Sequence, residues 1–269
     1  MAMASGALKD KVKCAGGICK AWRFLRNVPE LWTTIELPSF YRSSFDGHAI
    51  LRLLGWLRDV SKVTSFKLDV GDRIPPDVTK KALAMMPGLT KLDLGGKKIS
   101  SAVVAHFAKQ PAAKNLESIA LDSDCKVKLP DLLTLLATAP NLKSLRASNM
   151  SSSDIFTGST VDDLELMALS MSKARNGGTP LLSSLDLTGG WRGCETPCSS
   201  FSKLGSRFPE LEVLRLKGCS PPSLPPSFLD VWNSVVPMAR LHTLSVGCLM
   251  KSSFFGPHLT TEELGNSVG

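Results

Sequence analysis

The segment LTKLDL at residues 89–94 decides the fold, because its pattern of leucines recurs along the chain at a nearly fixed period. Its fourth and sixth residues are apolar and alternate with polar ones, which is typical of a short strand with one buried side. The same pattern, or a close variant of it, begins at six other places: VTSFKL at Val63, LESIAL at Leu116, LKSLRA at Leu142, LSSLDL at Leu182, LEVLRL at Leu211 and LHTLSV at Leu241.

The spacing of these segments indicates the architecture. Their starts are separated by 26, 27, 26, 40, 29 and 30 residues. A strand with a return helix in roughly 20–29 residues is the leucine-rich repeat. One such unit cannot bury its own apolar face, so the units must stack. We therefore predict an α/β leucine-rich-repeat solenoid with parallel strands on the concave face and helices outside. A strand that buries Ile35 and Leu37 brings the expected number of units to about eight.

The residues between the segments predict helices. Asp77 is expected to cap a helix over residues 78–86. Proline stands two residues before the first leucine of four repeats and should stop the preceding helix there. These prolines are Pro87, Pro140, Pro180 and Pro209.

Two irregular segments interrupt the repeats. Residues 148–160, SNMSSSDIFTGST, are rich in serine and threonine and read as an inserted surface loop. Residues 189–200 carry Trp191 beside two glycines. A tryptophan there either packs against the edge of the repeats or is offered to a partner, and both interpretations stay open.

Bulk composition narrows the class of protein. The 269 residues are 43% hydrophobic and 21% charged, as in ordinary globular proteins. The N-terminus lacks the apolar core of a secretory signal, and no apolar run approaches the roughly 20 residues of a membrane helix. The seven cysteines are scattered without a framework spacing. We expect reduced thiols in a cytoplasmic or nuclear protein that does not enter a membrane.

Residues 14–37, CAGGICKAWRFLRNVPELWTTIEL, follow a different pattern, with two tryptophans ahead of the first strand. This segment resembles the closing half of the F-box, which reads roughly V-C-K-x-W-R and then D-P-x-L-W before an apolar strand. The matching residues are Ile18, Cys19, Lys20, Trp22 and Arg23, followed by Pro29, Leu31, Trp32, Ile35 and Leu37. The implied domains are a basic segment at 1–13, a partial F-box-like segment at 14–38 and a leucine-rich-repeat domain at 39–269.

The resemblance to F-box/leucine-rich-repeat proteins implies a function. Members of that family are substrate receptors of Skp–cullin–F-box ubiquitin ligases, in which the F-box docks on a Skp-family adaptor and the repeats hold the substrate. The front half of an F-box is missing ahead of Cys14, so we expect either a truncated derivative or a repeat protein without the ligase connection. Trp22 and Trp32 could also simply form the hydrophobic cap of the solenoid. The implied adaptor-binding residues are Ile18, Cys19, Trp22, Leu25, Pro29, Leu31 and Trp32.

No motif in the sequence predicts catalysis. The four histidines are far apart, and Cys194 with Cys198 makes at most half of a zinc site. Gly189 and Gly190 lack the lysine and hydroxyl of a phosphate-binding loop. We expect a protein that is not an enzyme and that needs neither a metal nor a cofactor.

The outward residues of the strands predict a binding surface. The third, fifth and seventh residues of each segment should face the concave side, where basic and acidic side chains are balanced. Such a surface suits a protein partner, whereas a nucleic-acid groove should be strongly positive. Half of the net charge of +8 lies in the first 30 residues, so binding to nucleic acid is the less favoured alternative. The same charges could instead pair with each other across strands. The candidate partner-binding residues are Lys67, Lys91, Asp93, Arg146, Asp186, Trp191, Arg215 and Lys217.

Overall fold

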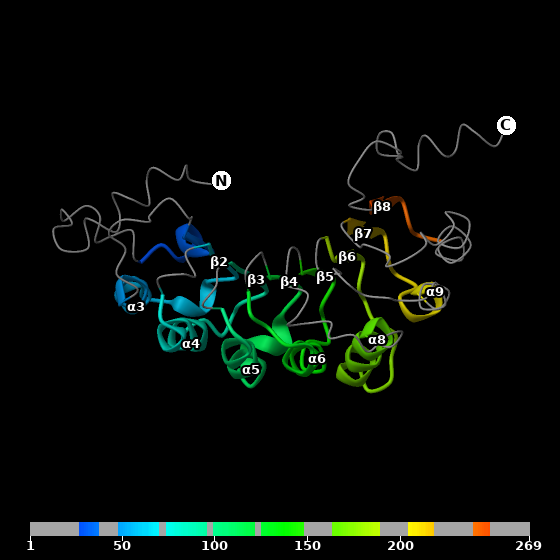
Figure 1. Ribbon diagram of the computed structural model, residues 1–269. Helices are drawn as coiled ribbons and strands as arrows, with labels where there is room; N and C mark the ends of the chain where they lie inside the picture. Colours follow the sequence, from blue (N-terminus) through cyan, green and yellow to red (C-terminus); the bar gives the residue numbers. More distant parts are fainter. Residues whose placement is uncertain are drawn as a thin grey trace, which may run out of the picture.

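The strands form one open, all-parallel sheet whose eight members follow chain order (Figure 1). The computed structural model describes residues 27–37, 48–69, 74–95, 99–121, 125–147, 163–188, 204–217 and 239–247. The prediction of an α/β fold with eight parallel strands is confirmed. The strands are β1 Thr34–Leu37, β2 Ser65–Leu68, β3 Lys91–Leu94, β4 Ser118–Leu121, β5 Ser144–Ala147, β6 Ser184–Asp186, β7 Val213–Lys217 and β8 Thr243–Gly247.

The helices lie along the outer side of the arc, and the strands line its inner side (Figure 1). The α-helices are α3 His48–Trp56, α4 Pro76–Ala84, α5 Ser101–Ala108, α6 Leu129–Leu136, α8 Asp163–Ala174 and α9 Leu204–Arg207. Three short 3-10 helices join them: η2 Pro29–Trp32, η3 Val60–Lys62 and η4 Pro111–Asn115. The expected cap at Asp77 is wrong. Pro75 occupies the N-cap position of α4 and Pro76 the first helical position, which proline favours, and Asp77 lies within the first turn.

The register of the sheet aligns the apolar residues of successive strands. The fourth residues of the segments pair in the order Phe66, Leu92, Ile119, Leu145, Leu185 and Leu214. All six are buried in the layer between the sheet and the helices. A one-residue shift would turn this whole row to the concave side, so the leucine pattern fixes the register.

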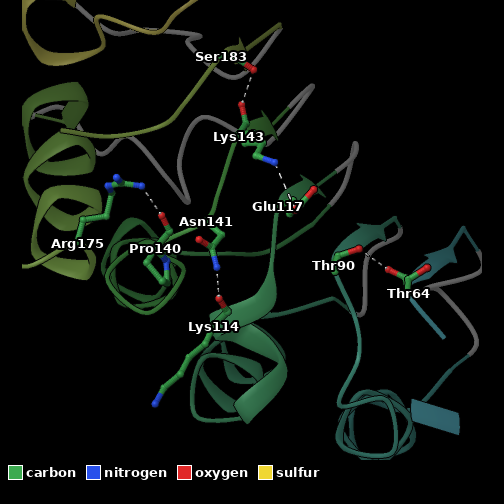
Figure 2. A network of polar contacts seen from close by, with 9 residues as sticks. All are labelled: Thr64, Thr90, Lys114, Glu117, Pro140, Asn141, Lys143, Arg175 and Ser183. Carbon is green, nitrogen blue, oxygen red and sulfur yellow. Dashed lines mark hydrogen bonds and ion pairs between the residues drawn. The ribbon is translucent and has the colours of Figure 1, made fainter. Parts of the chain in front are cut away.

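Backbone hydrogen bonds tie the starts of neighbouring strands together. The carbonyl of Thr64 accepts from the N–H groups of both Thr90 and Lys91, each at 2.9 Å. The same arrangement, in which one carbonyl accepts from two N–H groups of the next unit, recurs from Thr33 before β1 to Glu212 before β7. Side chains add to it, since the hydroxyl of Thr90 donates to the Thr64 carbonyl at 3.1 Å (Figure 2).

A second set of bonds joins the turns that precede the strands. The Asn141 amide donates to the Lys114 carbonyl at 3.1 Å, and Asn115 makes the equivalent bond to Pro87 at 3.2 Å. Leu181 holds the corresponding position in the next unit and cannot donate from its side chain. There the guanidinium of Arg175 donates to the Pro140 carbonyl at 3.3 Å instead (Figure 2). In the unit before that of Asn115, Gly88 holds this position. An added Cβ there would collide with the Ser61 carbonyl.

The N-terminal end of the described sheet is closed by two tryptophans. Trp32 is only 4% exposed, and its ring lies 5.7 Å from that of Trp56 at an interplanar angle of 86°. Such an edge-to-face pair is a favoured aromatic geometry. Since β1 also pairs with β2 in full register, residues 29–37 belong to the same core as the repeats.

Candidate partner-binding site

Two rows of side chains cover the concave face of the sheet, because alternate residues of a strand face the same side. We call the third residues of five successive segments the hydroxyl row: Ser65, Lys91, Ser118, Ser144 and Ser184. We call the fifth residues the charged row: Glu36, Lys67, Asp93, Ala120, Arg146, Asp186 and Arg215.

The two rows line a hollow of about 400 Å³ that extends from β1 to β7. The charged residues of its lining are four basic and three acidic. In the middle of the hollow, β4 contributes Ser118 and Ala120, and β5 contributes Ser144 and Arg146. The curvature of the sheet therefore presents an open trough with small polar side chains on one side and long charged ones on the other.

A chain of ion pairs runs along the charged row. Asp93 lies between two cations, with its Oδ2 atom 3.9 Å from Lys67 Nζ and 3.5 Å from Arg146 Nη2. Arg146 reaches Asp93 from two strands away. The intervening strand carries Ala120 at this position, and its short side chain leaves the space that the guanidinium occupies.

A second pair closes the other end of the row. Arg215 Nη1 lies 3.6 Å from Asp186 Oδ2. The other carboxylate oxygen of Asp186 accepts from the N–H and hydroxyl of Thr188, at 3.0 and 2.6 Å. Only 13% of the Asp186 side chain is exposed, so little of it is accessible to a partner, whereas half of the Arg215 side chain is. The two pairs of Asp93 are more exposed, and exposed ion pairs contribute about 0–1 kcal/mol each to stability.

The structure brings six of the eight candidate residues to the hollow: Lys67, Lys91, Asp93, Arg146, Asp186 and Arg215. Trp191 lies outside the described residues, as does the side chain of Lys217 at the end of β7. Five of the six are joined by the ion pairs above, as in the alternative of mutual pairing. Within the described part of the chain, Lys91 is exposed and forms no ion pair.

The sequence reasoning missed the serines of the hydroxyl row. Their signal was present, because a serine stands at the third place of VTSFKL, LESIAL, LKSLRA and LSSLDL. Charged residues at alternate positions of a strand indicate a binding surface, whereas serines near a turn are common on any protein surface. The register makes them significant, since it places four of them in one line across the hollow.

The F-box-like residues are only partly described. Ile18, Cys19, Trp22 and Leu25 lie outside the described residues. Trp32 is buried, and its ring packs against that of Trp56. Pro29 and Leu31 are half-buried in η2, and Leu31 packs against the core. Pro29 and Leu31 therefore keep part of their surface accessible, whereas Trp32 has almost none.

The described residues contain no group of three or more histidine, cysteine, aspartate or glutamate side chains that could hold a metal ion. None of their helices has both the length and the apolar character needed to span a bilayer.

Comparison with known proteins gives a likeness of fold. No family model matches the sequence, and no curated protein matches it. Among solved structures, the chain is similar to one in the crystal structure of the Rad7 and Elc1 complex of yeast, with a TM-score of 0.52 and 16% sequence identity. The alignment covers 90% of this chain and 56% of that chain. At this identity the likeness concerns the fold alone: an α/β chain whose parallel strands form one open sheet.

Proposed function

We propose that this chain is a non-enzymatic repeat protein that binds a protein partner in the concave hollow. The observation that carries the proposal is the lining of that hollow, where fixed charges of both signs stand beside a row of hydroxyl groups. Ion pairs hold most of the charges in defined positions before a partner arrives. Pre-ordered charges of alternating sign set the register and specificity of a protein contact.

The charge balance separates this proposal from nucleic-acid binding. Affinity for nucleic acid comes from neutralising many phosphates, which needs a surplus of cations along the groove. The hollow has four basic and three acidic residues, so its surplus is a single charge. Strong, salt-dependent binding of generic RNA by the chain would favour the alternative of a basic RNA-associated protein.

Charge reversal on the concave face tests the proposal. The double variant Arg146→Glu, Arg215→Glu replaces the two guanidiniums by carboxylates beside Asp93 and Asp186. We expect it to weaken partner binding by at least about tenfold, since interfacial arginines often carry much of the binding energy. The measurement is quantitative mass spectrometry of proteins retained from a cell lysate by the immobilised chain, followed by titration of each retained protein.

The matched control is Lys109→Glu, Lys126→Glu, which makes the same change of net charge at two exposed residues outside the hollow. It should retain the same proteins as the wild type. Equal retention by the concave variant and the control would contradict a binding role for the concave face.

We further infer that the partner is a substrate presented to an SCF-type ubiquitin ligase, or that the chain is a truncated derivative of such a substrate-recognition subunit. Three observations support this. The closing half of the F-box pattern continues from Pro29 into β1 without a break, the repeats follow at once, and the similar yeast chain was crystallised in a complex of two proteins. The alternative is a stand-alone repeat scaffold with no link to ubiquitin.

A binding assay with a purified Skp-family adaptor separates these two functions. If the chain docks through its F-box-like segment, the wild type binds the adaptor and Leu31→Ser weakens that binding, because Leu31 is half-exposed beside the matched Pro29. Val28→Ser is the control, since Val28 is exposed next to the motif but is not part of it. Absence of wild-type binding in calorimetry would rule out a working substrate receptor and leave the truncated derivative or the stand-alone scaffold.

A further inference from the structure

The hydroxyl row is a line of four serines and one lysine across neighbouring strands. Its residues are register partners in the order Ser65, Lys91, Ser118, Ser144 and Ser184. Adjacent strands are about 4.8 Å apart, so the line from Lys91 to Ser184 measures about 14 Å. An extended chain advances about 3.3 Å per residue, and four or five residues would therefore cover this line.

Lys91 differs from the other cations of the hollow. Lys67, Arg146 and Arg215 each face a carboxylate at 3.5–3.9 Å. Lys91 is exposed, stands between two serines in register, and has no ion-pair partner among the described residues. A carboxylate that arrives there gains a cation and a hydroxyl donor without breaking any existing pair.

The charge of the hollow limits the anion that it can take. Four basic and three acidic side chains leave a surplus of one positive charge. Asp93 lies two residues from Lys91 on the same strand and repels a second negative charge. A single carboxylate matches this surplus, whereas a dianionic phosphoryl group exceeds it.

From this arrangement we propose that the hollow binds an extended acidic segment of the protein partner, with one aspartate or glutamate carboxylate held by Lys91 and Ser118. The rest of the segment lies along Ser144 and Ser184, whose hydroxyls can donate to and accept from its backbone. This inference deepens the proposed function and rests on it. It names the chemistry that the concave face selects.

A peptide selection followed by a double-mutant cycle tests this site. A random heptapeptide library displayed on phage is selected on the full chain, and binders that depend on Arg146 and Arg215 are kept. We expect an aspartate or glutamate at one fixed position. For a synthetic binder, changing that residue from Glu to Gln should weaken binding to the wild type by about two- to fivefold, as for an exposed ion pair.

The cycle assigns the contact. With Lys91→Gln, the same change in the peptide should have no further effect, because the carboxylate has lost its partner. Lys109→Gln is the matched control, since Lys109 is exposed outside the hollow, and it should preserve the full loss. Fluorescence polarisation with labelled peptides resolves these differences.

The outcomes separate this inference from the proposed function. Binders that need Arg146 and Arg215 but show no acidic position, or a Glu-to-Gln effect that persists in Lys91→Gln, overturn the carboxylate site and leave concave binding intact. Recovery of no concave-dependent binder also overturns the carboxylate site. The protein-retention experiment with the charge-reversed chain then decides the proposed function by itself.

Discussion

Replacing Trp32 by alanine should lower the free energy of unfolding by about 3–5 kcal/mol, the range for a buried tryptophan. Its ring is 4% exposed and forms an edge-to-face pair with Trp56, so truncation leaves a cavity and also removes the aromatic contact. Urea denaturation followed by far-ultraviolet circular dichroism measures the loss. Hydrogen exchange should locate it at β1 and β2, because units of a solenoid depend on their nearest neighbours.

Val28→Ala is the matched control for Trp32→Ala. Val28 precedes the same 3-10 helix and is 39% exposed, so its truncation should change stability by less than about 0.5 kcal/mol. An unchanged unfolding midpoint for Trp32→Ala would place the ring at the surface. It would then be free to contact an adaptor, as the F-box resemblance implies.

Leu92→Ala should cost about 2–5 kcal/mol of stability, since it removes a buried side chain from the middle of the apolar row. Leu92 pairs with Phe66 on one side and Ile119 on the other, and all three are buried. Its loss therefore weakens two interfaces between units. We expect a lower urea midpoint and faster hydrogen exchange on both sides of β3, unlike the one-sided effect at Trp32.

Leu169→Ala provides the comparison for Leu92→Ala. Leu169 lies in α8 and is 49% exposed, so the same change of side chain creates no enclosed cavity. Its effect should stay within about 0.5 kcal/mol. Similar losses in the two variants would contradict the inward assignment of the fourth residue in each segment.

The periodic part of the fold could be predicted from the sequence because each segment carries its own evidence. Leucines at fixed places define which side of a strand is buried, and their spacing defines how often a strand returns. Local details were less secure. Asp77 was expected to cap α4, but that helix begins two residues earlier, at Pro76, because the fixed backbone of proline is already compatible with a helix start.

The candidate site was predictable as a surface but not as a set of contacts. Alternation placed Lys67, Asp93 and Arg146 on one face, and in the structure all three line the same hollow. Arg146 reaches Asp93, two strands away, because Ala120 on the intervening strand has a small side chain. Likewise, the burial of Asp186 depends on how the chain turns back at Thr188, which no periodic pattern contains.

The sequence by itself determined the architecture of this protein, because a repeated pattern of buried leucines allows one register and one stacking order of the strands. The tertiary structure decided which side chains are free to act. Trp32 packs against Trp56 in the core, and Asp186 pairs with Arg215 and accepts hydrogen bonds from Thr188. Lys91 stays exposed beside a line of serines. Those outcomes depend on distances between residues of different repeats, and such distances exist only once the units have stacked.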